Sequence, residues 1–470
     1  MSGILRANSQ LRQRLRAGAE SFLNHGAGAV ERLLPHIEVS AWQEGSWRHP
    51  SAVWTSSKRT EVRITFAIGG RHDKTARSLR ATVKRRRTRV IGKAAEVISS
   101  REHSICGLIA SRVSQVFDEF APDAQVDGSA GARHKAFDEA SLAAIKSSFD
   151  EFVVASHLQA HHHLRLRITA VLGALHTLSE QSYENKALTF GCILDPNEHR
   201  KAVWSRFPSQ VLTSKRYKAL SDGFRTAYVV SSRGSVIDFV DLDRYERAQV
   251  TDRHFFPEWA ESIARASRRG KCGIALSRQG DLLVFDEGSL RFTYRYGRWQ
   301  YWNHAYLVKL LRDRARAQRV RPQILGRVVG AMYRVALDVS FRRSGGLFVI
   351  LHNRRNLRQI VRRGDAIADG ERARIDQEFD TVFEGHTFQS LSRRVAVELA
   401  SLDGAVVLEN SGRILAYGAV LQPKRSGRLR GTEGSRTKAA IGASNYGLAM
   451  KISSDGDISV YFDGEEFIRV

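Results

Sequence analysis

The C-terminal third of the chain carries short apolar runs bounded by glycines, and this pattern constrains the fold more than any other feature. The runs lie at 345–351, 402–408, 412–421, 447–452 and 457–462. Runs of this length that are rich in Val, Ile, Leu and Phe are typical of buried strands. Helix-like segments lie between them, so the pattern predicts a mixed β-sheet flanked by helices.

The rest of the chain mixes helical and β-type patterns. Apolar residues recur at helical spacing in 105–120, 137–152 and 306–339. The β-type runs are 61–68, 164–168, 188–194, 227–231 and 235–240, and a small meander follows at 281–302. The fold class that we predict is therefore α+β or α/β.

The length of 470 residues favours two or three domains. We expect a basic, mixed helical region at 1–130, an α+β domain at 131–320 and a third domain at 325–470. The polar stretch 122–133 is the best candidate for a linker.

The chain is strongly basic, with a formal net charge of +25. Residues 71–93 hold ten Lys or Arg against one acid, and 309–363 hold fifteen against two. A basic run can bind nucleic acid, but it can equally form a solvated helix or an arm. Binding of nucleic acid through 71–93 therefore stays an open alternative.

Cysteine usage and hydropathy place the protein in the cytoplasm. The three cysteines (Cys106, Cys192 and Cys272) are far apart, which argues against a disulfide framework and a cysteine-built zinc site. No apolar run approaches the roughly 18 residues that span a bilayer. The N-terminus has no continuous apolar segment of a secretory signal.

Two clusters could bind ligands but have simpler interpretations. Four histidines lie close together: His157, His161, His162 and His163. His157 and His161 share a helix face, as metal ligands do, but no acidic residue is near in sequence, so a solvated cluster is preferred. Trp299, Tyr301 and Trp302 are expected to pack in a sheet rather than to stack on a base.

The loop that enters an Ala-rich helix near the C-terminus can bind phosphate: Gly434, Ser435, Arg436, Thr437 and Lys438. Backbone N–H groups at a helix start attract phosphate, and this loop adds hydroxyls and two cations. Asp403 stands at the entry to a strand, before Gly404, which lets a ligand approach closely. A carboxylate that faces a phosphate loop is the minimum for metal-assisted nucleotidyl transfer.

These residues resemble the diadenylate cyclase domain family (the DAC, or DisA N-terminal, type). That family carries an Asp-Gly-Ala motif, matched here by Asp403, Gly404 and Ala405, and a later Gly-Thr-Arg-His-Arg motif, matched in register by 434–438. The likeness covers roughly 325–470. The α+β region before it resembles, by its position, the probable sensor domains called DACNV.

The resemblance implies a function and a set of roles. The family condenses two ATP molecules into cyclic di-AMP with a divalent metal, Mg²⁺ or Mn²⁺, and two domains face each other, so self-association is implied. Asp403 would bind metal and act on the 3′-hydroxyl with Gly404 and Ala405 in the catalytic motif, and 434–438 would bind the nucleotide.

The sequence departs from the family at two places. Thr437 stands where the family has histidine, and Ser454 replaces a later carboxylate; in the family these two groups help to hold the metal. A hydroxyl is a poor ligand for a transition metal, but the loss matters less for Mg²⁺. An alternative is therefore a domain that binds ATP or a cyclic dinucleotide as a receptor, without turnover.

Overall fold

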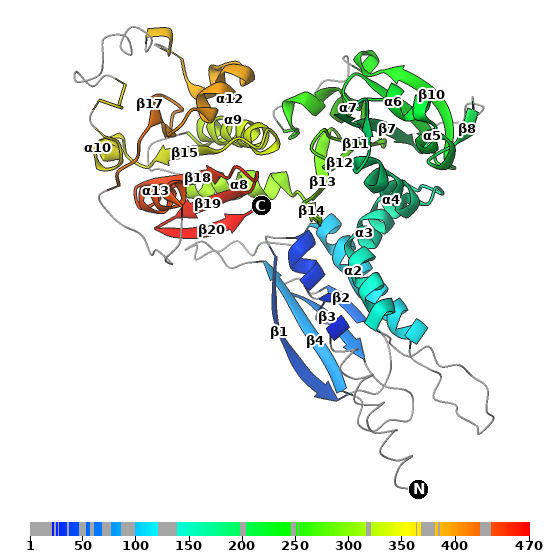
Figure 1. Ribbon diagram of the computed structural model, residues 1–470. Coiled ribbons are helices and arrows are strands. Elements are labelled where there is room, and N and C mark those ends of the chain that lie inside the picture. The colour runs from blue at the N-terminus through cyan, green and yellow to red at the C-terminus, as the bar shows by residue number, and fades with distance from the viewer. Residues whose placement is uncertain are drawn as a thin grey trace, which may run out of the picture. The chain divides into compact units, whose positions relative to one another are not determined.

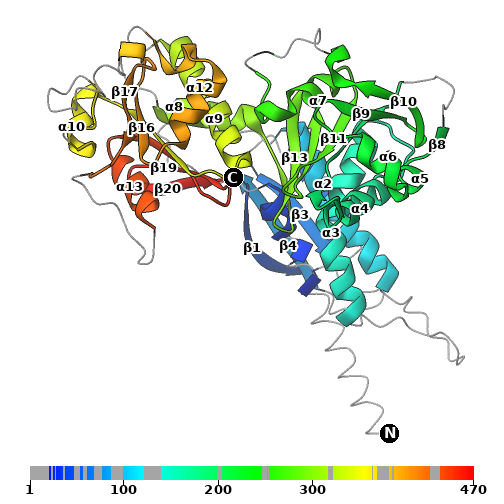
Figure 2. The ribbon, with the colours of Figure 1, turned by 45° about the horizontal axis from the view of Figure 1, so that its top comes forward.

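A computed structural model gives the fold of the chain (Figures 1 and 2). The structure describes residues 21–22, 25–26, 28–34, 37–46, 53–56, 61–67, 77–85, 99–120, 139–197, 204–245, 251, 253–315, 321–362, 364–367, 381–383, 386–423 and 434–470. The chain forms two compact units. Unit 1 comprises 1–242, 269–286 and 291–302, and unit 2 comprises 243–268, 287–290 and 303–470.

Among the described residues, unit 1 contains two main sheets and several helices, with further helical residues at 28–33. The helices include α2 (Ser100–Phe120), α3 (Glu139–His161), α4 (Ile168–Ser179), α5 (Ser209–Thr213) and α6 (Lys215–Leu220). The smaller sheet has the order β1-β4-β3-β2, from β1 (Ile37–Ser46), β2 (Val53–Ser56), β3 (Glu61–Ala67) and β4 (Arg77–Arg85). A short hairpin joins β5 (Ser182–Tyr183) and β6 (Lys186–Ala187).

The larger sheet of unit 1 has eight strands in the order β14-β13-β12-β11-β7-β9-β10-β8. They are β7 (Phe190–Asp195), β8 (Trp204–Arg206), β9 (Thr226–Ser231), β10 (Ser235–Asp241), β11 (Cys272–Leu276), β12 (Leu282–Asp286), β13 (Ser289–Arg295) and β14 (Arg298–Tyr301). The first two residues of β13 belong to unit 2. Strand β7 pairs in parallel with β9 and antiparallel with β11, so the sheet is mixed.

Unit 2 is built on a six-stranded mixed sheet. Its order is β17-β16-β15-β18-β19-β20, from β15 (Gly346–Leu351), β16 (Ala405–Glu409), β17 (Ile414–Ala419), β18 (Gly447–Ile452), β19 (Ile458–Phe462) and β20 (Glu465–Arg469). The helices are α7 (Glu261–Ala266), α8 (His304–Ala315), α9 (Pro322–Phe341), α10 (Leu357–Ile360), α12 (Arg393–Ser401) and α13 (Ser435–Ala443).

Helices cover both faces of this sheet, because its central strand is apolar on both sides. All six residues of β15 are buried. Leu347, Val349 and Leu351 share a core cluster with Ala440 and Ile441 of α13. Alternate residues such as Phe348 point to the other face, where α8, α9 and α12 pack (Figure 1). The predicted mixed sheet flanked by helices is confirmed, and the chain as a whole has an α+β fold.

Most of the predicted elements are present, but one predicted strand is absent, and several elements were not predicted, among them β1, β2, β4 and α4. The segment 164–168 is not a strand: Leu164 and Leu166 are buried in an extended link between α3 and α4, where the N–H groups of Arg165 and Leu166 both donate to the carbonyl of Ser232. An extended link that alternates inward and outward residues has the same pattern as a strand. Strand β20 was not predicted. The linker 122–133 lies outside the described residues.

Each of the three cysteines is buried and unpaired. Burial raises the pKa of the Cys192 thiol to about 12, and it also raises the pKa of Cys106 and Cys272. None of the helices in the described part of the chain is both long and apolar enough to cross a membrane.

Candidate nucleotide-binding site

The structure brings together the two motifs that the sequence singled out. Asp403 lies in the turn between α12 and β16, with its side chain fully exposed to solvent. Arg436 lies in the first turn of α13, and its Nη2 is 3.6 Å from Asp403 Oδ1. A carboxylate and a guanidinium that are 33 positions apart in the sequence thus meet at one edge of the sheet.

The strand arrangement explains this meeting. Strands β15 and β16 run in parallel, so their amino ends lie at the same edge. Gly345 comes just before β15, and a Cβ at this position would lie 1.9 Å from Arg436 Nη1. The guanidinium therefore lies against the backbone that enters β15 and points to the turn that enters β16.

Gly404 has a packing role that the sequence did not reveal. Its φ is +116°, and a Cβ there would lie 2.3 Å from the carbonyl carbon of Gly418 in β17. The expectation was that this glycine admits a ligand, but the space beside it is filled by the neighbouring strand. Ala405 is likewise buried and pairs with Ala419, so it contributes packing rather than a chemical group.

The start of α13 presents exposed residues and a nearby set of cations. Gly434 is the N-cap, and Gly434, Ser435 and Lys438 are exposed. Thr437 Oγ1 accepts a hydrogen bond of 3.0 Å from Lys451 Nζ of β18. Burial and the nearby positive charges of Arg469 and Arg436 lower the pKa of Lys451. This crowding of cations around the helix start favours an anion there.

The other residue that departs from the family motif is solvent-exposed. Ser454 lies in the turn after β18, in which the N–H of Gly456 donates to the carbonyl of Ser453. The hydroxyl of Ser454 adds no strong ligand for a metal.

The surroundings of Asp403 fit a hydrated Mg²⁺ better than a transition metal. Within the described ranges, the one convergent group of three His, Cys, Asp or Glu side chains is in unit 1 and does not include Asp403. Mg²⁺ usually keeps several waters and uses one or two carboxylates together with substrate phosphates. A single exposed carboxylate beside a phosphate loop fits that mode of binding.

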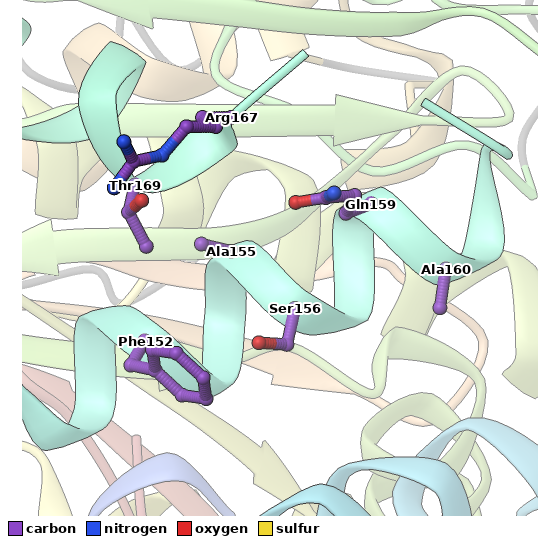
Figure 3. A pocket seen from close by; sticks show the side chains of 7 residues that line it. All are labelled: Phe152, Ala155, Ser156, Gln159, Ala160, Arg167 and Thr169. Atoms are coloured by element: carbon purple, nitrogen blue, oxygen red, sulfur yellow. The ribbon is translucent and has the colours of Figure 1, made fainter. Parts of the chain in front are cut away.

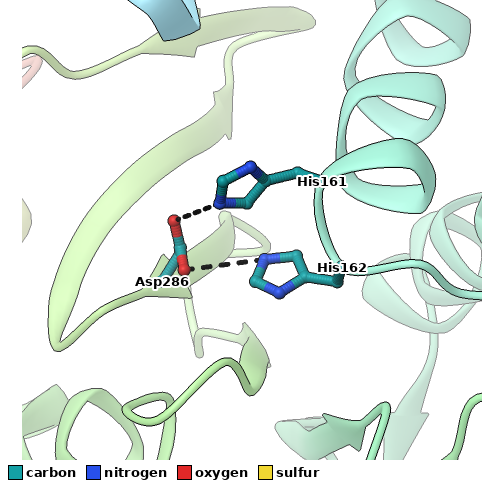
Figure 4. Close-up of side chains that lie close together, drawn as sticks. All are labelled: His161, His162 and Asp286. Atoms are coloured by element: carbon teal, nitrogen blue, oxygen red, sulfur yellow. Dashed lines mark ion pairs between the residues drawn. The ribbon is translucent and has the colours of Figure 1, made fainter.

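The histidine cluster of unit 1 differs from the solvated cluster that the sequence indicated. His157 and His162 are each only 4% exposed, and Asp286, at the end of β12, faces His161 and His162 (Figure 4). Burial lowers the pKa of His157 to about 4 and also lowers that of His162. Asp286 is more than 120 positions away in sequence, so no local spacing could have indicated it.

The aromatic residues of the meander are core residues, as expected. Trp299, Tyr301 and Trp302 are 2 to 4% exposed, and Trp302 Nε1 donates a 3.0 Å hydrogen bond to Thr293 Oγ1.

A shallow depression of about 570 Å³ lies along α3 and the start of α4 (Figure 3). The residues that line it are Phe152, Ala155, Ser156, Gln159, Ala160, Arg167 and Thr169. Arg167 is its single charged group, so the depression is poorly suited to a triphosphate.

The basic run 71–93 contains strand β4, which pairs with β1 and β3, where a helix or an arm was considered. Residues 71–76 and 86–93 of the run lie outside the described residues. Nucleic-acid binding through this run stays a prediction.

Comparisons with known proteins give little further information. No protein-family model and no curated protein matches the chain. A crystal structure of DacA from Staphylococcus aureus, a double mutant, is 19% identical, with 30% of this chain and 86% of that chain covered and a TM-score of 0.22. A hypothetical membrane spanning protein from Bacillus cereus is 17% identical, with coverages of 36% and 76% and a TM-score of 0.23. Scores this low establish neither a shared fold nor a shared activity.

Proposed function

We propose that unit 2 binds ATP between Asp403 and the start of α13, and that two such sites condense two ATP molecules into cyclic di-AMP. The observation that carries this proposal is the 3.6 Å approach of Arg436 Nη2 to Asp403 Oδ1. It juxtaposes an acid with a phosphate-binding cation, in the two motifs that resemble the diadenylate cyclase family.

Each motif has a role in this proposal. The guanidinium of Arg436 can take two phosphate oxygens at once, and Lys438 adds a point charge at the same helix start. Asp403 accepts the proton of the 3′-hydroxyl as that hydroxyl attacks the α-phosphorus of the second ATP and pyrophosphate leaves. The same step at the second site closes the ring and releases the second pyrophosphate. A divalent metal bound with the phosphates would neutralise charge that develops in this step.

The exposure of Asp403 supports a reaction shared between two copies of the chain. Its side chain is fully exposed, so the chain by itself does not enclose the reacting groups. A second copy that faces the first would supply the second ATP and exclude water. Self-association is therefore part of the proposal.

The test is to incubate the full chain with ATP and Mg²⁺ or Mn²⁺ and to analyse the products by mass spectrometry. We expect cyclic di-AMP from the wild-type chain, and a loss of at least about 100-fold in Asp403→Asn and Arg436→Ala, since each removes a group that contacts the reacting atoms.

Matched controls lie at the opposite end of the same sheet. Asp463→Asn changes an acid in the turn between β19 and β20, and Arg413→Ala changes an exposed arginine just before β17. Both should retain wild-type product formation. Equal losses in these controls and in the site variants would contradict the proposal.

A receptor that does not turn over nucleotide is the second candidate. It is favoured because, within the described residues, Asp403 belongs to no convergent group of three His, Cys, Asp or Glu side chains. A receptor forms no cyclic di-AMP under any metal condition. It still binds ATP or cyclic di-AMP, and Arg436→Ala weakens that binding. The product assay distinguishes the two candidates, and calorimetry with each nucleotide measures the binding that a receptor requires.

A further inference from the structure

We infer that His161, His162 and Asp286 form a binding site for a divalent first-row transition metal ion of the Zn²⁺ type in unit 1. His161 is the last residue of helix α3, His162 follows it, and the aspartate ends strand β12 (Figure 4). One ligand atom from each residue lies within 4.8 Å of the others. The site is separate from the nucleotide site proposed in unit 2.

The His162 ring uses one nitrogen to bond a backbone carbonyl, and its other nitrogen faces Asp286. His162 Nδ1 lies 3.0 Å from the carbonyl oxygen of Gly270. A carbonyl can only accept, so Nδ1 carries the proton and Nε2 presents a lone pair. Metal-binding histidines are oriented in this way by a carbonyl or carboxylate behind the ring.

His161 is held in the same tautomer by a different partner. Arg101 Nη2 lies 3.2 Å from His161 Nε2, and a guanidinium can only donate, so in the neutral ring that accepts from Arg101, His161 Nε2 carries the lone pair and faces Asp286. The lone pairs of two imidazoles and the oxygens of one carboxylate therefore converge. A bound cation would satisfy all three groups.

Two of these acceptors are buried without any hydrogen bond. His162 Nε2 and Asp286 Oδ1 have no hydrogen-bond partner, and the two side chains are 2% and 4% exposed. The two atoms are 3.6 Å apart, which is too long for a hydrogen bond. Buried acceptors without a hydrogen bond are costly, and a cation held between these two atoms would satisfy both.

The separation of the two atoms matches a shared metal ion. Ligand atoms about 2.0–2.2 Å from a tetrahedral Zn²⁺ lie about 3.3–3.6 Å from each other. His161 Nε2 is 3.5 Å from the other carboxylate oxygen, Asp286 Oδ2, so each imidazole faces its own oxygen of the same carboxylate. Imidazole with carboxylate is a donor set for Zn²⁺ and its neighbours rather than for Ca²⁺.

The Arg101 guanidinium occupies the position between His161 and Asp286 that a metal ion would need. Its Nη2 is 2.6 Å from Asp286 Oδ2, and its side chain is 24% exposed. A metal ion and this guanidinium compete for the same carboxylate oxygen and the same imidazole. Metal binding therefore requires Arg101 to turn toward solvent, which couples the site to helix α2.

The experiment uses the full chain, freed of metal with a chelator and then dialysed against Zn²⁺. Bound zinc is measured by mass spectrometry, affinity by competition with a chromophoric chelator, and geometry by the visible spectrum of the Co²⁺ form. We expect one tight Zn²⁺ per chain. His161→Ala and Asp286→Asn should each weaken it by more than about tenfold.

Two further variants separate metal binding from a structural role. His163→Asn changes an adjacent exposed histidine whose φ of +51° an asparagine tolerates, and it should bind Zn²⁺ like the wild type. Arg101→Gln should bind Zn²⁺ more tightly, because it removes the competing guanidinium.

The inference is overturned if the wild-type chain holds no stoichiometric Zn²⁺. It is also overturned if His161→Ala, folded by circular dichroism, binds as tightly as His163→Asn. An affinity of Arg101→Gln equal to that of the wild type would refute the competition between Arg101 and the metal.

Discussion

Gly404 and Gly434 each belong to one of the two site motifs, but a side chain would meet very different surroundings at the two positions. A methyl group at Gly404 would collide with the backbone of Gly418, at a φ of +116° that disfavours any L side chain. Nothing lies within 4 Å of a Cβ at Gly434, whose φ is −64°. Alanine at Gly404 therefore tests the packing of the fold, whereas alanine at Gly434 tests contact with a ligand.

We predict that Gly404→Ala lowers the free energy of unfolding of unit 2 by about 2 kcal/mol or more. Gly434→Ala should cost about 1 kcal/mol or less, the usual penalty for alanine at an N-cap. Urea unfolding measures both. A Gly404→Ala variant as stable as Gly434→Ala would mean that β17 does not pack against this turn as described.

Of the two glycine variants, Gly434→Ala should have the smaller effect on stability but the larger effect on ATP affinity. If phosphate approaches the start of α13 closely, Gly434→Ala weakens ATP binding, because its methyl group occupies open space in front of the helix. Calorimetry with ATP checks this. Unchanged affinity in Gly434→Ala would indicate that the nucleotide does not approach this turn.

At the residue scale, the sequence indicated which types of residue matter but not what each one contacts. The Asp403–Arg436 approach was expected from a carboxylate that faces a phosphate loop. The burial of Ala405 and the bond from Lys451 to Thr437 depend on strand pairing, which no local motif encodes.

Among the elements of unit 2, α9 and α12 are joined by two ion pairs that differ in burial. Asp338 is 2% exposed and accepts two hydrogen bonds from Arg393, whereas Arg342 and Glu398 form an exposed pair. Removing one partner of a buried pair leaves an uncompensated charge, but an exposed pair contributes little.

We predict that Asp338→Ala destabilises unit 2 by about 3–5 kcal/mol, and that Glu398→Ala costs about 1 kcal/mol or less. The same helices carry both changes, so the difference reports burial rather than helix propensity. Denaturant unfolding followed by circular dichroism measures it. Equal effects would contradict the assignment of Asp338 as the buried anchor of this helix pair.

Elements were predicted correctly where the spacing of apolar residues fits one kind of structure. The prediction failed at 164–168, where alternation of apolar and polar residues fits both a strand and an extended link. The apolar runs of β15 and β18 were predicted as buried strands, and both are strands whose residues are mostly buried. The alternation at 164–168 is produced by an extended link instead. The pairing of Asp286 with His161 and His162 depends on β12 ending beside α3, and therefore on tertiary structure.

At the scale of the whole molecule, the proposed reaction needs two chains. We predict that the initial rate of cyclic di-AMP formation per chain rises with protein concentration and then levels off, as two copies associate. Mass spectrometry over a dilution series measures the rate. A rate per chain that is independent of concentration down to the lowest dilution would contradict a shared site between separable copies.

The range 325–470, predicted from sequence as a domain, omits segments that unit 2 includes. Asp338 Oδ1 accepts a 2.7 Å hydrogen bond from the N–H of Glu258, and Arg393 donates to the carbonyl of Phe256. His304 lies between the hydroxyl of Tyr333 and the carbonyl of Leu290, at 2.9 and 2.7 Å. These partners are distant in sequence, so motif spacing could not include them.

A fragment of residues 325–470 should therefore be less stable than the same region in the full chain. Without 243–268, Asp338 and Arg393 lose buried partners, and without 303–324 Tyr333 loses His304. Each unsatisfied group costs about 1–3 kcal/mol. Hydrogen exchange at the amides of β15 and β18 measures the loss of stability. A fragment of 303–470, which restores α8 and His304, should show protection between that of 325–470 and that of the full chain. Protection in 325–470 equal to that in the full chain would show that the C-terminal sheet is stable without the segments that precede it.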